Sequence, residues 1–224
     1  QNPIEQNKPE EKEGPQDMSD AGIEKLFDVY FMGDDAILYN YRGTRKTLTI
    51  PSTYKGKPVT ALDGYYDGKK GDTTKLQELN IPKTLRYIEG EVFSGYRNLK
   101  KVNIEEGIQM IGPATFAKTG LEEIEIPNSL GEIGGGAFGD ARVKVKAGNT
   151  KFEVREGCVI DKEENKIVCG GKGATIPKDI KKIGDAAFAK TGLENITVHA
   201  DVEEIEPAAF GDAKVTVEEG NVKY

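Results

Sequence analysis

Two cysteines and one histidine are the residues of this sequence best suited to covalent or metal chemistry. Cys158 and Cys169 alone supply too few ligands for a metal site. His199 has no serine or cysteine near it in the sequence that would form a convincing nucleophilic pair. We therefore predict no catalytic residue, no metal site and no cofactor, and we expect a protein that is not an enzyme.

The two cysteines lie in a segment that reads as a β-hairpin. Residues 158–161 and 166–169 are strand-like and are separated by the polar turn 162–165. If Asp161 opposes Lys166, counting outward places Cys158 directly opposite Cys169 in a non-hydrogen-bonded pair, with Cα atoms about 4.5 Å apart. That separation is within disulfide reach. The sequence predicts a Cys158–Cys169 disulfide in an oxidising compartment, and two free thiols are the alternative.

Charged side chains recur at fixed positions of a motif, L-x-x-I-x-I, that repeats along the chain. Positions 2, 3 and 5 of this motif point away from the core, because successive strand residues face opposite sides. Along position 3, neighbouring repeats from Glu78 to Arg142 alternate in sign. This face is either a self-neutralised solvated surface or a polar surface for a protein partner. The candidate partner-binding residues are Glu78, Lys100, Lys101, Glu122, Glu123, Glu125, Arg142 and Lys144.

Aromatic side chains, which anchor many tight interfaces, are missing from these strand positions. We therefore expect weak or multivalent binding rather than a single tight site. Tyr65, Tyr66 and Tyr96 lie in predicted loops, where each either contacts a partner or is buried.

A duplication positions these residues. The segment 116–149 returns as 188–221 at a constant offset of about 72, with 19 of 34 residues identical. Inside it, a smaller unit of about 22 residues is marked by Phe93, Phe116 and Phe138. Repeats of this length are typical of solenoids, whose units cannot bury a hydrophobic face alone. The sequence therefore predicts an α/β, β-rich solenoid with stacked parallel strands in one sheet and single helical turns opposite them.

The totals fit this architecture and exclude some functions. The chain has 224 residues, a hydrophobic content of 37% and 27 glycines, which suits a thin core with many turns. Its net charge of −7 argues against nucleic-acid binding, which needs basic surface. No apolar run approaches the roughly 20 residues that span a bilayer.

The domain organisation follows from composition and repeats. Residues 1–20 are polar and are predicted to form a disordered tether, with or without a role in attachment. Residues 21–224 are predicted to form one repeat domain, which consists of an N-terminal hairpin cap (21–46), repeats (47–148), an interrupting hairpin (149–174) and further repeats (175–224). The last residues align with the start of the interrupting hairpin, so we expect either a missing C-terminal cap or a short end.

The sequence resembles the BspA-like leucine-rich-repeat proteins over about residues 27–224. The resemblance rests on the I-P and I-G-x-x-A-F elements, on residues 50–60, and on the interruption from Phe152 to Asp161. It implies a right-handed leucine-rich-repeat superhelix and a secreted or surface-anchored bacterial protein. Some members are implicated in adhesion to host matrix proteins or to other cells, and the family brings no catalytic residues.

We therefore expect a non-enzymatic interaction or adhesion module at the bacterial cell surface or outside the cell. Its partner would be an extracellular protein or glycan, such as a host matrix protein, and the module is expected to be a monomer. A structural spacer without a ligand is the alternative. Membrane attachment is expected only through an N-terminal anchor, as in a lipoprotein, and this chain carries no export signal.

Overall fold

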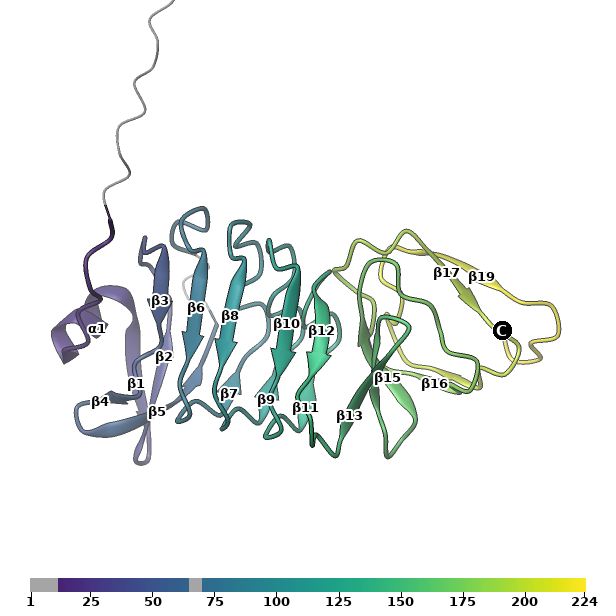
Figure 1. Ribbon diagram of the computed structural model, residues 1–224, viewed down its shortest axis with the longest axis horizontal. Coiled ribbons are helices and arrows are strands. Elements are labelled where there is room, and N and C mark those ends of the chain that lie inside the picture. The colour runs from purple at the N-terminus through teal and green to yellow at the C-terminus, as the bar shows by residue number, and fades with distance from the viewer. Residues whose placement is uncertain (1–11, 65–69) are drawn as a thin grey trace, which may run out of the picture.

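The computed structural model of the chain is an elongated solenoid with two rows of short strands along its long axis (Figure 1). The structure describes residues 12–64 and 70–224. The strands within each row pair mainly in parallel, and helix is confined to a single short element among the described residues. The predicted β-rich solenoid is confirmed.

The N-terminal end is formed by a helix and a hairpin. Helix α1 (Asp20–Leu26) was not predicted, and it begins at the N-cap Ser19, whose hydroxyl accepts a hydrogen bond from Gly22 N at 3.1 Å. The predicted hairpin is confirmed as β1 (Asp28–Met32) and β2 (Asp35–Tyr39), which pair antiparallel. β2 then pairs in parallel with the first strand of the second row.

The predicted tether is too long at its C-terminal side. Glu13 accepts a backbone hydrogen bond from Thr47 N at 3.0 Å, and Gln16 both accepts from and donates to the backbone of Thr49. These side chains satisfy the open edge of strand β3 (Thr47–Thr49), which explains why the segment is held against the fold. Residues 1–11 lie outside the described residues.

The first row of strands carries the L-x-x-I-x-I motifs. Instead of the one parallel sheet we predicted, it forms three separate ladders, β3-β6-β8, β10-β12 and β17-β19. The inserted hairpin separates the last two ladders, and the stretch before Ile176, which was expected to resume the row, forms no strand. The further strands of this row are β6 (Glu78–Ile81), β8 (Lys101–Ile104), β10 (Glu123–Ile126), β12 (Arg142–Val145), β17 (Asn195–Val198) and β19 (Lys214–Val217).

The second row consists mostly of two-residue strands centred on buried aliphatic residues. It is also broken by the insertion, because β11 does not pair with the strands that follow. β5 pairs in addition with β4 (Thr53–Tyr54) in a small antiparallel hairpin. The strands of this row are β5 (Lys57–Leu62), β7 (Tyr87–Ile88), β9 (Met110–Ile111), β11 (Glu132–Ile133), β16 (Lys182–Ile183) and β18 (Glu204–Ile205).

The I-G-x-x-A-F segments form tight turns rather than the single helical turns we predicted. Each holds its third residue after the isoleucine at a positive φ, for example 53° at Ala114 and 62° at Gly136. The turns stack through backbone hydrogen bonds such as Phe116 N to Ala137 O at 2.8 Å. Their phenylalanines stack as well, with 5.8 Å between the ring centroids of Phe93 and Phe116.

The insertion is a three-stranded antiparallel unit of β13 (Phe152–Arg155), β14 (Cys158–Asp161) and β15 (Lys166–Gly170). The predicted hairpin between β14 and β15 is confirmed, with its turn at 162–165, and β13 is an additional strand. The unit lies between the two sets of repeats and divides the core into two clusters.

The predicted Cys158–Cys169 disulfide is wrong in this structure, where both thiols are free and buried. A β-bulge shifts the register, so that Cys158 opposes Gly170 and Cys169 opposes Val159. Because a one-residue shift moves a side chain to the other face of a sheet, Cys158 packs in the second core cluster and Cys169 in the first.

Candidate interaction face

Strand alternation in the first row of strands directs the predicted charged residues outward. In β10, Ile124 and Ile126 are buried, whereas Glu125 is exposed. The registers place Glu78 beside Lys101 and Glu123 beside Arg142, as predicted from the repeat spacing. The first row therefore presents an ordered polar surface, which we call the charged face. It comprises the eight residues Glu78, Lys100, Lys101, Glu122, Glu123, Glu125, Arg142 and Lys144.

Glu123 is the centre of this face. Its carboxylate lies 2.7 Å from Lys144 Nζ and 2.6 Å from Arg142 Nη2. Hydrogen bonds from Lys144 and Arg142 lower the pKa of Glu123, which stays ionised at neutral pH. The register places Glu125 beside Lys144 as we expected, but the Lys144 ammonium turns to Glu123 instead.

Lys101 and Glu78 form the second ion pair, with 3.2 Å between Nζ and Oε1. The same carboxylate accepts a hydrogen bond from Asn103 Nδ2 at 2.9 Å. Asn103 also donates to Asn80 Oδ1 at 2.7 Å, and Asn80 donates to the Thr49 hydroxyl at 3.3 Å. This ladder of amides at position 5 was not predicted, although asparagine at that position in two successive repeats was a signal for it.

Three of the predicted residues lack the ion pairs expected of them. Among the residues that the structure describes, no ion pair joins Lys100 to Glu122, and Glu125 forms none. Lys100 and Glu122 precede β8 and β10, and these two strands are neighbours that do not form a ladder. The predicted alternation of charge is therefore continuous in sequence, but it is interrupted in space between β8 and β10.

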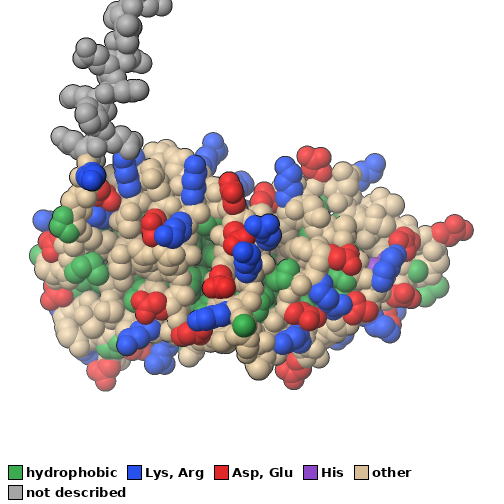
Figure 2. Space-filling model, in the orientation of Figure 1, with side chains coloured by type: hydrophobic (Ala, Val, Ile, Leu, Met, Phe, Trp, Pro, Cys, Tyr) green, Lys and Arg blue, Asp and Glu red, His purple; other side chains and the backbone are tan. Residues whose placement is uncertain are grey.

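We call this interruption the seam, and partly exposed core residues lie beside it. The inward residues of β8, Val102 and Ile104, are only half-buried, as are those of β12, whereas those of β6 and β10 are buried. Figure 2 shows charged side chains of both signs over these strands, with hydrophobic surface visible between them. The charged face thus has an apolar strip within a polar surround, which is the usual composition of a protein-binding surface.

The predicted loop aromatics do not add to this face. Tyr96 is fully buried and packs edge-on against Phe93, with 5.8 Å between ring centroids. Tyr65 and Tyr66 lie outside the described residues.

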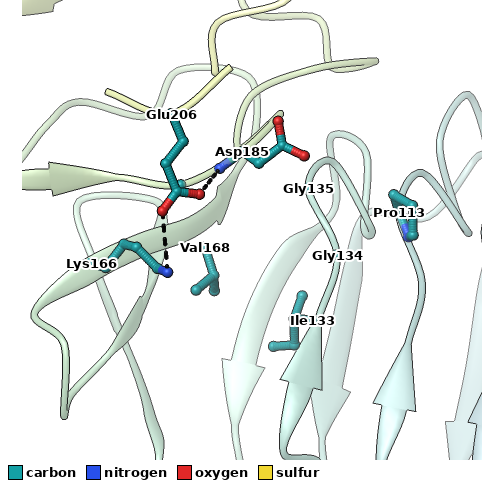
Figure 3. Close-up of a pocket in the computed structure, with 9 residues that line it drawn as sticks. Pro113, Ile133, Gly134, Gly135, Lys166, Val168, Asp185 and Glu206 are labelled. Atoms are coloured by element: carbon teal, nitrogen blue, oxygen red, sulfur yellow. Dashed lines mark hydrogen bonds and ion pairs between the residues drawn. The ribbon is translucent and has the colours of Figure 1, made fainter. Parts of the chain in front are cut away.

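A cleft of about 290 Å³ lies on the other side of the molecule, between β11 and the strands β15 and β16 (Figure 3). Ile133 and Val168 supply apolar walls. Lys166 Nζ lies 3.5 Å from Glu206 Oε1, and the other oxygen of Glu206 accepts a hydrogen bond from Asp185 N at 2.8 Å. The Lys166 ammonium and the Glu206 carboxylate of the cleft therefore bond to each other, and we assign the cleft no ligand.

Comparison with protein-family models gives one match, the BspA-type leucine-rich-repeat region, in six copies. The match covers residues 71–146 and 169–217, more than half of the chain. The chain belongs to the BspA-type leucine-rich-repeat family. The first matched range ends before β13 and the second begins at residue 169, inside β15, so most of the insertion lies outside the matched repeats.

A solved structure of a bacterial protein shares the fold of this BspA-type protein, and two further bacterial structures are similar to it at lower TM-scores. The pneumococcal vaccine antigen PcpA is 17% identical with a TM-score of 0.55, over 86% of this chain and 67% of that chain. A T. pallidum leucine-rich-repeat protein is 18% identical with a TM-score of 0.47, over 86% of this chain and 84% of that chain. A leucine-rich cell surface protein from Faecalibacterium prausnitzii is 16% identical with a TM-score of 0.38, over 86% and 74%. None of the curated proteins compared by sequence matched.

The histidine and the two cysteines of this BspA-type protein are buried within the fold. His199 is buried in a repeat turn, where Nε2 lies 3.0 Å from Pro177 O and Nδ1 accepts a hydrogen bond from Asp201 N. Burial raises the pKa of Cys158 to about 12, and it raises that of Cys169 as well, so both thiols stay protonated. Within residues 12–64 and 70–224, no cluster of three or more metal-ligating side chains forms, and no helix is long and apolar enough to cross a membrane.

Proposed function

We propose that this protein is a non-enzymatic interaction module of the bacterial cell surface or of the secreted fraction, and that it binds an extracellular protein or glycan through the charged face. Family membership supports the surface role, since some BspA-type repeat proteins are implicated in adhesion. The observation that carries the choice of face is the array around Glu123, in which ladder-paired strands hold both signs of charge in fixed positions.

A preformed array of this kind favours binding. The strands are tied by parallel ladders, so the side chains that they present lose little conformational freedom when a partner arrives. The half-buried Val102 and Ile104 of the seam supply apolar contact beside the charges. Without aromatic anchors the affinity of one copy is modest, and the charges act mainly on specificity and association rate.

The partner that fits is a protein or glycan with a mixed-charge, polar surface, such as a host matrix protein. A net charge of −7 makes nucleic acid a poor partner. Binding to the charged face should weaken with salt but persist at physiological ionic strength, because part of the contact is apolar.

The test is binding of the purified chain to immobilised matrix proteins, mucins and polysaccharides at low and at physiological salt. A variant with Lys100, Lys101, Glu123 and Arg142 changed to alanine should lose saturable binding. The control changes Lys181 and Glu203 to alanine, which removes an equally exposed ion pair of 2.8 Å outside the charged face. Binding that survives the four changes would exclude this face.

The second candidate function is a spacer that displays another part of a longer protein. The observation in its favour is that the charged face holds four acidic and four basic residues, which sum to zero and so leave little net charge for a partner. No binding to any member of the panel at either salt concentration would favour the spacer.

We further propose attachment to the bacterial surface through the N-terminal segment, as in a lipoprotein. Proteolytic shaving of intact source cells tests this location. Release of repeat fragments from unbroken cells would support it, and recovery of the protein only after lysis would contradict it.

A further inference from the structure

A second cleft, of about 320 Å³, lies on the side of the first row of strands after the insertion. We call the repeats before the insertion the first block and those after it the second block. One side of the cleft is the stretch 174–178, and the other is the outward surface of β17 and β19. The charged face belongs to the first block, so this cleft is a separate place along the same row.

The insertion and two small residues open this cleft. At the offset of 72, residues 173–176 take the place of β8, but they form no strand. Gly173 and Ala174 stand where β8 has a lysine and a valine, so less side-chain volume fills this position. Thr175 is held by the insertion instead, because its N–H donates to Glu156 O at 3.1 Å and its hydroxyl to Glu156 Oε2 at 2.6 Å. The stretch is therefore tied to the turn between β13 and β14 rather than to a ladder with β17.

One edge of β17 is open along the cleft. The ladder with β19 uses the backbone oxygens of Glu194 and Val198. Because alternate residues of a strand direct their backbone groups to opposite sides, Asn195 and Thr197 point theirs away from β19 and toward the cleft. Among the described residues, no backbone hydrogen bond joins these two residues to the stretch 174–178. The cleft therefore has backbone donors and acceptors available to a ligand.

The side chains that are open to a ligand in this cleft are uncharged. They are Asn195, Thr197 and Thr216. All three are exposed, and they stand where the first block has two glutamates and a lysine. Within the described part of the chain, none of the three side chains forms a hydrogen bond to another residue. The charged residues of the lining are already bonded, Glu156 to the threonine beside it and Lys178 to Glu218.

Two contacts fix the shape of the cleft. His199 Nε2 lies 3.0 Å from Pro177 O, which holds the stretch beside the end of β17. Lys178 Nζ lies 2.9 Å from Glu218 Oε1 and joins the two sides. A ligand that enters this preformed cleft orders few protein groups. Its volume is at the lower end of the range of about 300–1,000 Å³ for ligand sites, so it suits a small molecule.

We propose that this cleft binds a neutral mono- or disaccharide. Each sugar hydroxyl both donates and accepts hydrogen bonds, which matches the open amide, hydroxyl and backbone groups. Ile176 and Ile196 supply apolar surface for the CH groups of the ring. An added peptide strand fits less well, because only two residues of β17 offer open backbone groups. The site goes beyond the proposed function, since it gives the second block a ligand class that the charged face does not serve.

The test is a titration of the isotope-labelled protein with maltose, lactose and chitobiose, followed through its amide NMR signals. At least one disaccharide should shift the signals of Asn195 and Thr197 in a saturable way. The shift should be the same at low and at physiological salt, because the ligand carries no charge. The signals of β10 and β12 should not move. No saturable shift of Asn195 and Thr197 with any of the three disaccharides would overturn the proposal.

Thr197→Val removes one hydroxyl from the cleft and keeps a β-branched side chain. It should weaken disaccharide binding about tenfold, which is the effect of about one hydrogen bond, and leave the melting temperature unchanged. The matched control is Thr53→Val, at an exposed strand threonine outside the cleft, and it should bind as the wild type does. Equal affinity of the two variants would contradict a role for Thr197.

Two further comparisons separate this site from its alternatives. The variant with four alanine changes in the charged face should keep its disaccharide shifts, and loss of these shifts would contradict a separate site. An uncharged peptide of serine, glycine and threonine is the competing probe. If the peptide shifts Asn195 and Thr197 and the three disaccharides do not, the open edge of β17 binds peptide and the saccharide assignment is wrong.

Discussion

The two copies of the duplicated segment keep the same interior and present different exteriors. Inward residues of β10 and β12 are matched in type by those of β17 and β19, for example Ile124 by Ile196 and Val143 by Val215. All four outward residues differ, since Glu123, Glu125, Arg142 and Lys144 are replaced by Asn195, Thr197, Lys214 and Thr216. Packing constrains the first set, whereas the second set was free to change.

Another pair of positions shows the same freedom at the edge of the strands. Lys146 pairs with Glu106 at 3.0 Å across 40 residues, and at the offset of 72 Lys178 pairs with Glu218 at 2.9 Å with the charges exchanged. The attraction is kept although neither residue is. Comparison of the two copies therefore separates the features that the solenoid needs, which are the buried packing residues and the ion pair, from the outward residues that a partner could contact.

The largest expected effect tests the shared interior. Phe116 and Phe188 correspond to each other and are both buried. Phe116→Ala and Phe188→Ala should each cost about 3–5 kcal/mol of unfolding free energy, since both leave a large cavity. Urea unfolding of the two variants measures this, and a cost at one site below half of that at the other would break the equivalence of the two cores.

A smaller effect is expected where the blocks touch. A Cβ at Gly136 would lie 2.1 Å from Ala189 O, and Gly136 already has a φ of 62°. Gly136→Ala should therefore cost about 1–3 kcal/mol through forced backbone movement. The matched control is Ala208→Gly at the corresponding position, where φ is 53° and alanine is tolerated.

Thermal unfolding compares these two variants. The control should change the melting temperature little, because glycine adopts a positive φ readily. Equal destabilisation by both changes would mean that the contact between the blocks is not what excludes a side chain at Gly136.

The insertion should make the protein sensitive to alkali. Cys158 has an ordinary pKa of about 9.0 when unfolded and about 12 when folded. Because the folded pKa is raised, its stabilising effect is complete below pH 9 and is lost as pH rises from about 9 to 12. Melting temperatures across this range measure the loss, and Cys158→Ala should reduce it without abolishing it, because burial also raises the pKa of Cys169.

The same thiols should be free and unreactive at neutral pH. Reductant should leave the intact mass unchanged, and a thiol reagent should label both residues only after unfolding. Rapid labelling of the native protein would contradict the buried position of Cys158 and Cys169 in the hairpin.

The smallest effect on stability is expected on the charged face. Replacing Glu123, Glu125, Arg142 and Lys144 by their second-block counterparts should shift the melting temperature by no more than about 3 °C, as exposed ion pairs contribute little. Calorimetry measures this, and a larger shift would mean that the face serves the fold and not a partner.

The sequence predicted the structure well where residues follow a regular pattern, such as the repeat spacing or a hairpin turn. The spacing of Phe93 and Phe116 predicted the period of the stacked repeats, and the turn at 162–165 predicted the β14–β15 hairpin. The bulge in β15 was not predictable, because it depends on Cys169 packing against the first core, and it reversed the conclusion about the cysteines. The seam beside β8 likewise arises from spacing between coils, which no single repeat encodes.

A local sequence signal was present for one of two features that we missed. Ser19 before a short polar and apolar run is an N-cap signal, but seven residues of helix are weak evidence without tertiary contacts. We assigned Glu13 and Gln16 to a polar tether. The hydrogen bonds that hold them join them to residues more than 30 positions away, so they leave no local signal in the sequence.

Exchange of the outward residues between the two blocks is the most direct measurement of the central claim, that the charged face of the first block binds the partner. One variant carries Glu123→Asn, Glu125→Thr, Arg142→Lys and Lys144→Thr, and the other carries the four reverse changes in the second block. Affinity for the partner found in the panel should fall at least tenfold in the first variant and should not fall in the second. Unchanged affinity in the first variant, with an unchanged melting temperature, would contradict the account.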